Sequence, residues 1–235
     1  MRLLLVLAVV FVVYSLTTAQ QTRPCKSPPY LMGKLVVSLK DEVKFWNYEY
    51  NRALQRMRVY ETENLVNRSL TNDFLLHFGE GVTYEMDGLT STCSKRPLRA
   101  DYQPIGIPDD ATSAMPLIFG SLSVPGGGMQ VNSWQGLSPR GEEYIKFVTE
   151  VGCVPHQATF YTEKHGQVTI VFLNSTVHNK AQDDLSPPGF CPEEDAQPTG
   201  RPVDLLELFL ESRIKKLKRT FSKLINVYLN NYSFL

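Results

Sequence analysis

The feature that most constrains this 235-residue chain is a succession of short β-branched and aromatic runs in which apolar and polar residues alternate. Gly, Pro, Asn or Asp interrupts the runs every eight to twelve residues, a pattern typical of antiparallel strands joined by turns. No helical pattern separates these runs, which excludes a doubly wound or barrel-type α/β enzyme. The predicted strands are Lys34–Leu39, Val43–Tyr50, Gln55–Glu61, Asp73–Phe78, Val82–Asp87, Met115–Leu122, Met129–Trp134, Glu143–Val151, Ala158–Glu163 and Gln167–Leu173.

The amino-terminal residues 1–19 predict a secretory signal peptide. A basic residue, Arg2, precedes the apolar run Leu3–Val13, and the small residues Thr17–Ala19 form a cleavage site. The run is shorter than the roughly 20 residues that cross a bilayer, so we expect cleavage after Ala19 rather than a membrane anchor. The mature chain is then exported and meets an oxidising compartment.

Four cysteines, Cys25, Cys93, Cys153 and Cys191, are expected to form disulfides in such a compartment, and three connectivities are open. The chain has no C-x-x-C pair and its four histidines lack ligand spacing, so we predict no metal-ligating residues. It also lacks the G-x-S-x-G, H-E-x-x-H, P-loop and G-x-G-x-x-G motifs. We therefore predict no catalytic residues and a protein that is not an enzyme.

The formal net charge is zero, with 24 basic and 24 acidic residues, which argues against nucleic acid as a partner. The charges are unevenly spread, because residues 212–235 carry six basic residues and no acidic one. Residues 191–202 form a Pro-rich acidic linker, and from Val203 apolar residues recur at steps of three and four. This spacing predicts an amphipathic helical tail over 203–235, whose basic end, 212–235, either docks on the acidic body or meets an anionic membrane surface.

Alternation also gathers aromatic and Met side chains on one face of the predicted strands. Across the turn Gly79–Gly81, Leu76 and Phe78 are expected to match Tyr84 and Met86. Such a face is either packed core or the wall of a cavity for an apolar ligand. The candidate pocket residues are Trp46, Tyr48, Met57, Val59, Leu76, Phe78, Tyr84 and Met86.

Three N-x-S/T sequons, at Asn67, Asn174 and Asn231, are candidate glycosylation sites in an exported chain. Paired acids such as Asp109 and Asp110 offer oxygen ligands for calcium, although no D-x-D-x-D-G loop is present. Calcium, held by glycans or surface acids, is the cofactor we consider, and no organic cofactor is expected.

Several blocks in a fixed order resemble the ependymin family, and together they span roughly residues 23–211. The basic segment beyond Glu211 has no counterpart in the family pattern. The blocks are Arg23–Pro29, Asp73–Asp87, Cys93, Ile107–Thr112, Gly120-Ser121, Trp134, Cys153–Pro155, Pro187–Cys191 and Leu205–Phe209.

The resemblance implies a secreted extracellular glycoprotein linked in fishes to cell–matrix adhesion, with calcium binding attributed largely to its sugars. The lysosome lumen is the alternative location. It implies a mainly β fold of two curved antiparallel sheets, like bacterial lipoprotein carriers, that enclose an apolar pocket, and it implies a homodimer. It also implies that Cys25 pairs with Cys153 and Cys93 with Cys191. Residues 20–190 would then be the ependymin-like β domain.

Two functions follow from these patterns. The first is a non-enzymatic protein that binds lipid or another apolar ligand in a pocket between β-sheets. The alternative is a calcium-responsive glycoprotein of the extracellular matrix that acts in cell adhesion through glycans and surface acids.

Overall fold

The structure is a computed structural model that describes residues 23–39, 42–63, 69–87, 90–99, 103, 105–178, 185–193 and 195–211. It confirms the mainly β, antiparallel class. Each predicted strand is present, and the structure contains one further strand, β6, that was not predicted. The predicted signal peptide and the basic end of the tail lie outside the described residues. The strands are β1 (Tyr30–Leu39), β2 (Glu42–Asn51), β3 (Arg56–Glu63), β4 (Ser69–His77), β5 (Val82–Asp87), β6 (Thr92–Pro97), β7 (Thr112–Gly120), β8 (Gly128–Leu137), β9 (Glu143–Thr149), β10 (Pro155–Thr162) and β11 (Gly166–His178).

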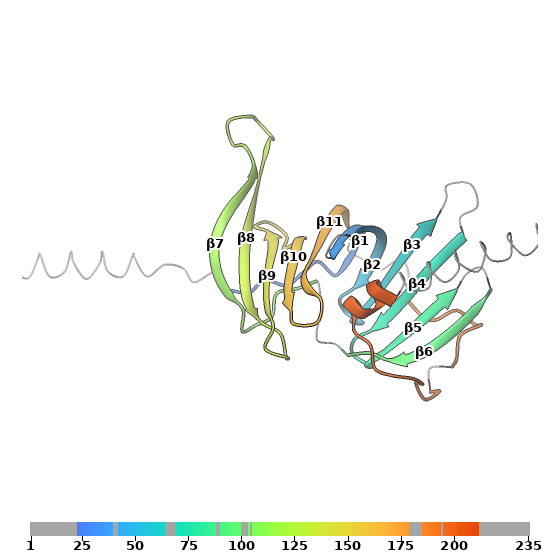
Figure 1. The fold of residues 1–235 in the computed structure, drawn as a ribbon. Helices are drawn as coiled ribbons and strands as arrows, with labels where there is room; N and C mark the ends of the chain where they lie inside the picture. Colours follow the sequence, from blue (N-terminus) through green and yellow to red (C-terminus); the bar gives the residue numbers. More distant parts are fainter. Residues whose placement is uncertain are drawn as a thin grey trace, which may run out of the picture.

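Within the described ranges these strands form one continuous 11-stranded sheet in the order β6-β5-β4-β3-β2-β1-β11-β10-β9-β8-β7. The two curved sheets that were expected are therefore two halves of one sheet. The first and last strands pair with each other at the centre, where Leu35 lies opposite Phe172 and Val37 opposite Ile170. On either side of this seam the two halves, β2–β6 and β7–β10, curve away from each other (Figure 1). The curvature follows from the twist that accumulates across neighbouring strands.

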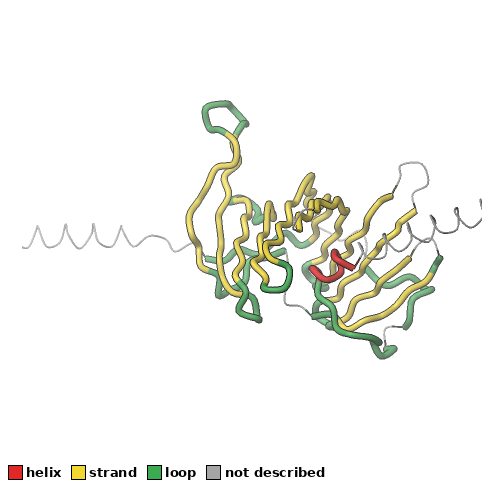
Figure 2. Tube along the Cα trace, in the orientation of Figure 1, coloured by secondary structure: helices red, strands yellow, loops and turns green. Residues whose placement is uncertain are grey.

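A short helix, residues 205–211, lies against the half of the sheet that contains β2–β5 (Figure 2). Asp204 and Glu207 form a capping box, because each side chain accepts a hydrogen bond from the backbone N–H of the other. The ring of Phe209 packs on that of Trp46, with 5.1 Å between the centroids. Among the described residues no helix is both long and apolar enough to cross a bilayer.

The helix also connects the two halves of the sheet through paired charges. Glu207 accepts hydrogen bonds from Arg99, which follows β6, and from Lys164, in the turn between β10 and β11, both at 2.7 Å. Burial alone would raise the pKa of Glu207, but the hydrogen bonds from Lys164 and Arg99 outweigh it and lower this pKa to about 2. Arg140, in the turn between β8 and β9, donates to Asp204 at 3.2 Å. The helix therefore holds β6 near the turns of the opposite half.

Two disulfides join Cys25 to Cys153 and Cys93 to Cys191, the pairing that the family resemblance implied. The first ties the segment before β1 to the turn between β9 and β10. The second ties β6 to residues 185–193. The Pro-rich segment 191–202, predicted as a linker, lies along β6, since Thr199 N–H donates to the carbonyl of Lys95 at 2.9 Å.

Replacing Phe209 by Ala should lower the free energy of unfolding by about 3–5 kcal/mol, because it removes a fully buried ring and leaves a cavity over Trp46. Urea unfolding followed by circular dichroism measures the change. The control is Phe190→Ala, at a position that is 49% exposed and should change stability little. Equal effects at the two positions would show that the helix does not contribute to the core.

Candidate ligand pocket

The structure places all eight predicted pocket residues in packed hydrophobic clusters. Six of them lie in the main cluster, which the helix 205–211 covers, and Tyr84 and Met86 lie in a second cluster with Leu75 and Leu185. None of the eight lines the cavity described below. The six in the main cluster are Trp46, Tyr48, Met57, Val59, Leu76 and Phe78.

The prediction that Leu76 and Phe78 match Tyr84 and Met86 was wrong. In the β4–β5 hairpin Tyr84 lies opposite Leu75, and Leu76 lies opposite Thr83. Because successive side chains point to opposite faces, a shift of one residue in register moves Tyr84 and Met86 to the other face of the sheet. The expected single apolar face is thus divided between two clusters.

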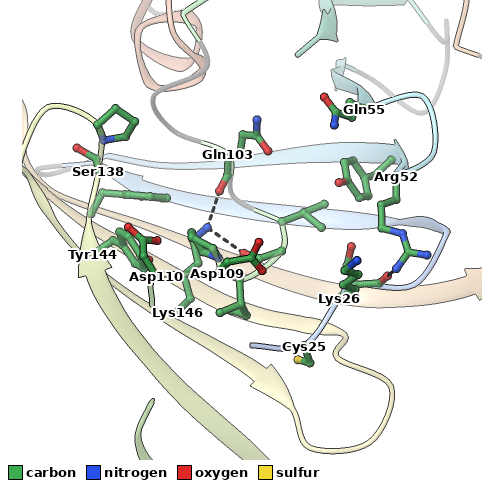
Figure 3. A pocket seen from close by; sticks show the side chains of 18 of the residues that line it. Cys25, Lys26, Arg52, Gln55, Gln103, Asp109, Asp110, Ser138, Tyr144 and Lys146 are labelled. Atoms are coloured by element: carbon green, nitrogen blue, oxygen red, sulfur yellow. Dashed lines mark hydrogen bonds between the residues drawn. The ribbon is translucent and has the colours of Figure 1, made fainter. Parts of the chain in front are cut away.

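A cavity of about 670 Å³ lies between strands β9 and β10, the loop 103–110, the β2–β3 turn and the segment before β1. Its lining mixes aromatic and aliphatic side chains with charged and amide groups (Figure 3). The apolar contributors are Tyr50, Ile105, Ile107, Leu137, Tyr144 and Phe160. The polar contributors include Lys26, Arg52, Gln55, Gln103, Asp109, Asp110, Ser138 and Lys146.

Lys146 is the buried cation of this cavity, with 4% of its surface exposed. Its Nζ donates hydrogen bonds to the carbonyl oxygens of Gln103 at 2.7 Å and Gly106 at 3.0 Å, which fixes the loop over β9 (Figure 3). It also lies 5.2 Å from the centroid of the Tyr144 ring. Burial lowers the pKa of Lys146 to about 7, while the two carbonyls and the ring favour the charged form.

Tyr144 contributes a buried hydroxyl to the same wall. Among the described residues this hydroxyl has no hydrogen-bond partner. Burial raises the pKa of Tyr144, so the phenol keeps its proton and can donate it. Gly136 faces it across the β8–β9 pair, and a Cβ at that position would clash with the Tyr144 hydroxyl. An unpaired buried donor beside a cavity can bind a polar group of a ligand.

The residues that line the cavity were not predicted from the sequence, although the pattern of β9 contains one indication of them. In β9, Tyr144, Lys146 and Val148 share the buried face, so alternation puts a lysine at an inward position between two apolar side chains. A charge at such a position indicates either a satisfied core cation or a site. Ile105 and Ile107 carry no comparable signal, because they lie in an irregular loop.

Of the predicted glycosylation sites, Asn67 and Asn231 lie outside the described residues. Asn174 is exposed, in the last half of β11, and has a positive φ of 51°. Asp109 and Asp110 are exposed at the cavity. Within the described part of the chain no three His, Cys, Asp or Glu side chains gather into a group that could hold a metal ion.

Comparison with known proteins gives the family of the chain. The family model described as Ependymin matches residues 66–191, more than half of the sequence. The chain belongs to the ependymin family. It is 30% identical to ependymin-2 of Carassius auratus over 175 residues, which cover 72% of this chain and 80% of that relative. It is 31% identical to ependymin-1 of Oncorhynchus mykiss over 169 residues, 69% of this chain and 75% of that relative.

Solved structures are less similar to this ependymin-family chain. An uncharacterized conserved protein from Thermus thermophilus aligns with 75% of this chain and 91% of its own, with a TM-score of 0.45 and 13% identity. A LolA superfamily protein from Nitrosomonas europaea aligns with 69% of this chain and 91% of its own, with a TM-score of 0.32 and 10% identity. Both scores are low, and neither likeness carries a functional conclusion.

The buried amine of Lys146 should make stability rise with pH above neutrality. Between pH values near 7 and near 10.5 the folded protein has lost the Lys146 proton while the unfolded chain keeps it, so the free energy of unfolding increases with pH. From about pH 7 to about pH 9 the gain should reach at most about 2–3 kcal/mol, measured by urea unfolding.

The variant Lys146→Met should lose this gain, since it has no amine to titrate. The control Lys34→Met, at an exposed position of β1, should keep the wild-type pH dependence. A Lys146→Met protein whose stability still rises with pH as steeply as that of the wild type would place the titrating group elsewhere.

Proposed function

We propose that this ependymin-family protein is an extracellular, non-enzymatic binding protein that holds lipid or another apolar ligand in the Lys146 cavity. The observation that carries the proposal is the cavity itself. Its volume of about 670 Å³ falls within the range of small-molecule sites, roughly 300–1,000 Å³. Family membership supports the extracellular location.

The lining indicates how such a ligand would be held. Phe160, Ile105 and Ile107 offer apolar contact, and burying an apolar chain against them is favourable by roughly 25 cal/mol per Å². The hydroxyl of Tyr144 is a buried polar group without a partner among the described residues, and it can orient the ligand. Lys146 is engaged with two carbonyls and maintains the wall rather than offering an open cation. The site therefore suits a mostly apolar molecule with one polar end.

The secreted protein should co-purify with lipid, which native mass spectrometry detects as a mass above that of the polypeptide and its glycans. Leu137→Trp should reduce the bound fraction several-fold, because Leu137 is 60% exposed and a larger side chain there would fill the mouth without disturbing the core. The matched control is Leu173→Trp, at a 39% exposed position outside the cavity. A protein that is free of lipid and takes up none from added micelles would contradict the proposal.

Exposed Asn174 favours a second candidate function, the calcium-responsive glycoprotein of matrix and cell adhesion. Here glycans and surface acids hold calcium, and matrix components or a second copy of the chain are the partners. In this second function the 212–235 tail would also contact a membrane surface.

Enzymatic removal of the glycans should abolish any calcium-dependent change in circular dichroism or sedimentation. Asn174→Gln should remove one glycan from the mass of the protein. A calcium response that persists at full strength after deglycosylation would assign the metal to protein acids instead.

A further inference from the structure

The tip of the hairpin formed by β7 and β8 extends beyond the rest of the sheet (Figures 1 and 2). The chain from Ala111 to Pro139, which contains this hairpin, carries no Asp, Glu, Lys, Arg or His. At its tip Leu122 is 72% exposed and Val124 58% exposed. A projecting element of this length without a charge is unusual, because water-facing hairpins are ordinarily rich in polar and charged side chains.

Both faces of the hairpin are apolar near the tip. Leu117 and Phe119 point to one face and Ile118 to the other, since successive side chains alternate, and each is at least 36% exposed. The ring of Phe119 also contacts His156 and Phe147, so this face is partly covered by the body. Ile118 and Leu122 lie side by side, because both approach the position that a Cβ on Gly128 would occupy. Exposed apolar groups thus surround the tip on both faces and at the apex.

This two-sided exposure decides between occupants. A single protein surface would cover one face and leave the other in water. Pairing of β7 with the same strand of a second copy is opposed by Pro116, which cannot donate a backbone hydrogen bond and is typical of edge strands that avoid such pairing. The apolar interior of a lipid layer, in contrast, would surround both faces and the apex at the same time.

The surroundings of the hairpin fit the boundary of a lipid layer. The turn between β9 and β10 lies at the same end, since Glu150 N–H donates to the carbonyl of Gln130, and its Val151 is 86% exposed. The same turn holds Cys153, whose disulfide to Cys25 brings the exposed cations Arg23 and Lys26 to this end. Glu150 is the acid in the turn. Apolar side chains that project beyond nearby cations can enter a lipid layer while the cations contact its anionic headgroups.

We propose that the tip of the β7–β8 hairpin inserts into the interface of a lipid surface, with Arg23 and Lys26 facing its anionic headgroups. Lys26 lines the Lys146 cavity, but the hairpin tip, which the variants below change, does not. The inference therefore stands or falls separately from the proposed ligand.

Co-flotation of the full chain with vesicles of phosphatidylcholine and phosphatidylserine tests the proposal. The double variant Leu122→Ser, Val124→Ser should bind the vesicles at least about tenfold more weakly, because it removes two aliphatic side chains from the inserted tip. The matched control, Val43→Ser with Phe45→Ser, alters side chains that are 58% and 66% exposed near the start of β2, away from the tip, and should bind like the wild type. The 212–235 tail is unchanged in all three proteins.

Unchanged binding of the tip variant would overturn the proposal. So would a wild-type dimer that the tip variant converts to a monomer in sedimentation, without vesicle binding by either protein, because the occupant would then be a second copy.

Leu122→Trp gives an independent readout, because the emission of the introduced tryptophan should shift to the blue and be quenched by brominated phosphatidylcholine. The native Trp46 and Trp134 are each 1% exposed and should escape quenching. Emission from the introduced tryptophan that stays water-like in the presence of vesicles would also overturn the proposal.

Discussion

The antiparallel pairing of β1 with β11 is the interaction on which the rest of the architecture depends. It brings the first and last strands of the sheet together at its centre, so that each half is a meander that leaves the seam and ends at an edge, β6 or β7. The entropy cost of closing this long loop is met by apolar side chains of both strands, among them Leu35, Val37 and Ile170. The Cys25–Cys153 disulfide adds a covalent link on the same side of the seam.

The helix 205–211 determines which apolar surface is core and which remains open. By covering Trp46 and its neighbours it uses the aromatic face of β2–β4 for folding, while its acids pair with cations from both halves of the sheet. The carboxylates of Asp204 and Glu207 are buried while their cations reach the solvent, so ion pairs as well as apolar contacts hold the helix in place. The open volume is left on the same face of the sheet but over its other half, beside Lys146, where the irregular loop 103–110 takes the place of the helix as cover.

Alternation and turn residues were sufficient to locate most strands, because many of them, such as β2 and β9, have one buried face with a period of two. They failed for β6, whose sequence TCSKRP lacks an apolar alternation and whose Lys95 is nevertheless buried. They also failed for the register across Gly79–Gly81, which depends on turn geometry. The cavity could not be predicted, since it is formed by loops distant in sequence, although the inward Lys146 was a visible signal. The disulfide pairing came from the family resemblance, not from spacing.

The β7–β8 hairpin connects an exposed apolar tip to the rim of the cavity. Its tip carries Leu122 and Val124. Its base borders the cavity through Asp109 and Asp110 before β7, and through Leu137 at the end of β8 and Ser138 after it. The loop that ends at Asp110 is also the one whose carbonyls accept the hydrogen bonds of Lys146. A lipid surface that holds the tip therefore contacts one end of a pair of strands whose other end forms part of the cavity rim. The two proposals, a bound apolar ligand and an inserted tip, therefore involve opposite ends of the same pair of strands.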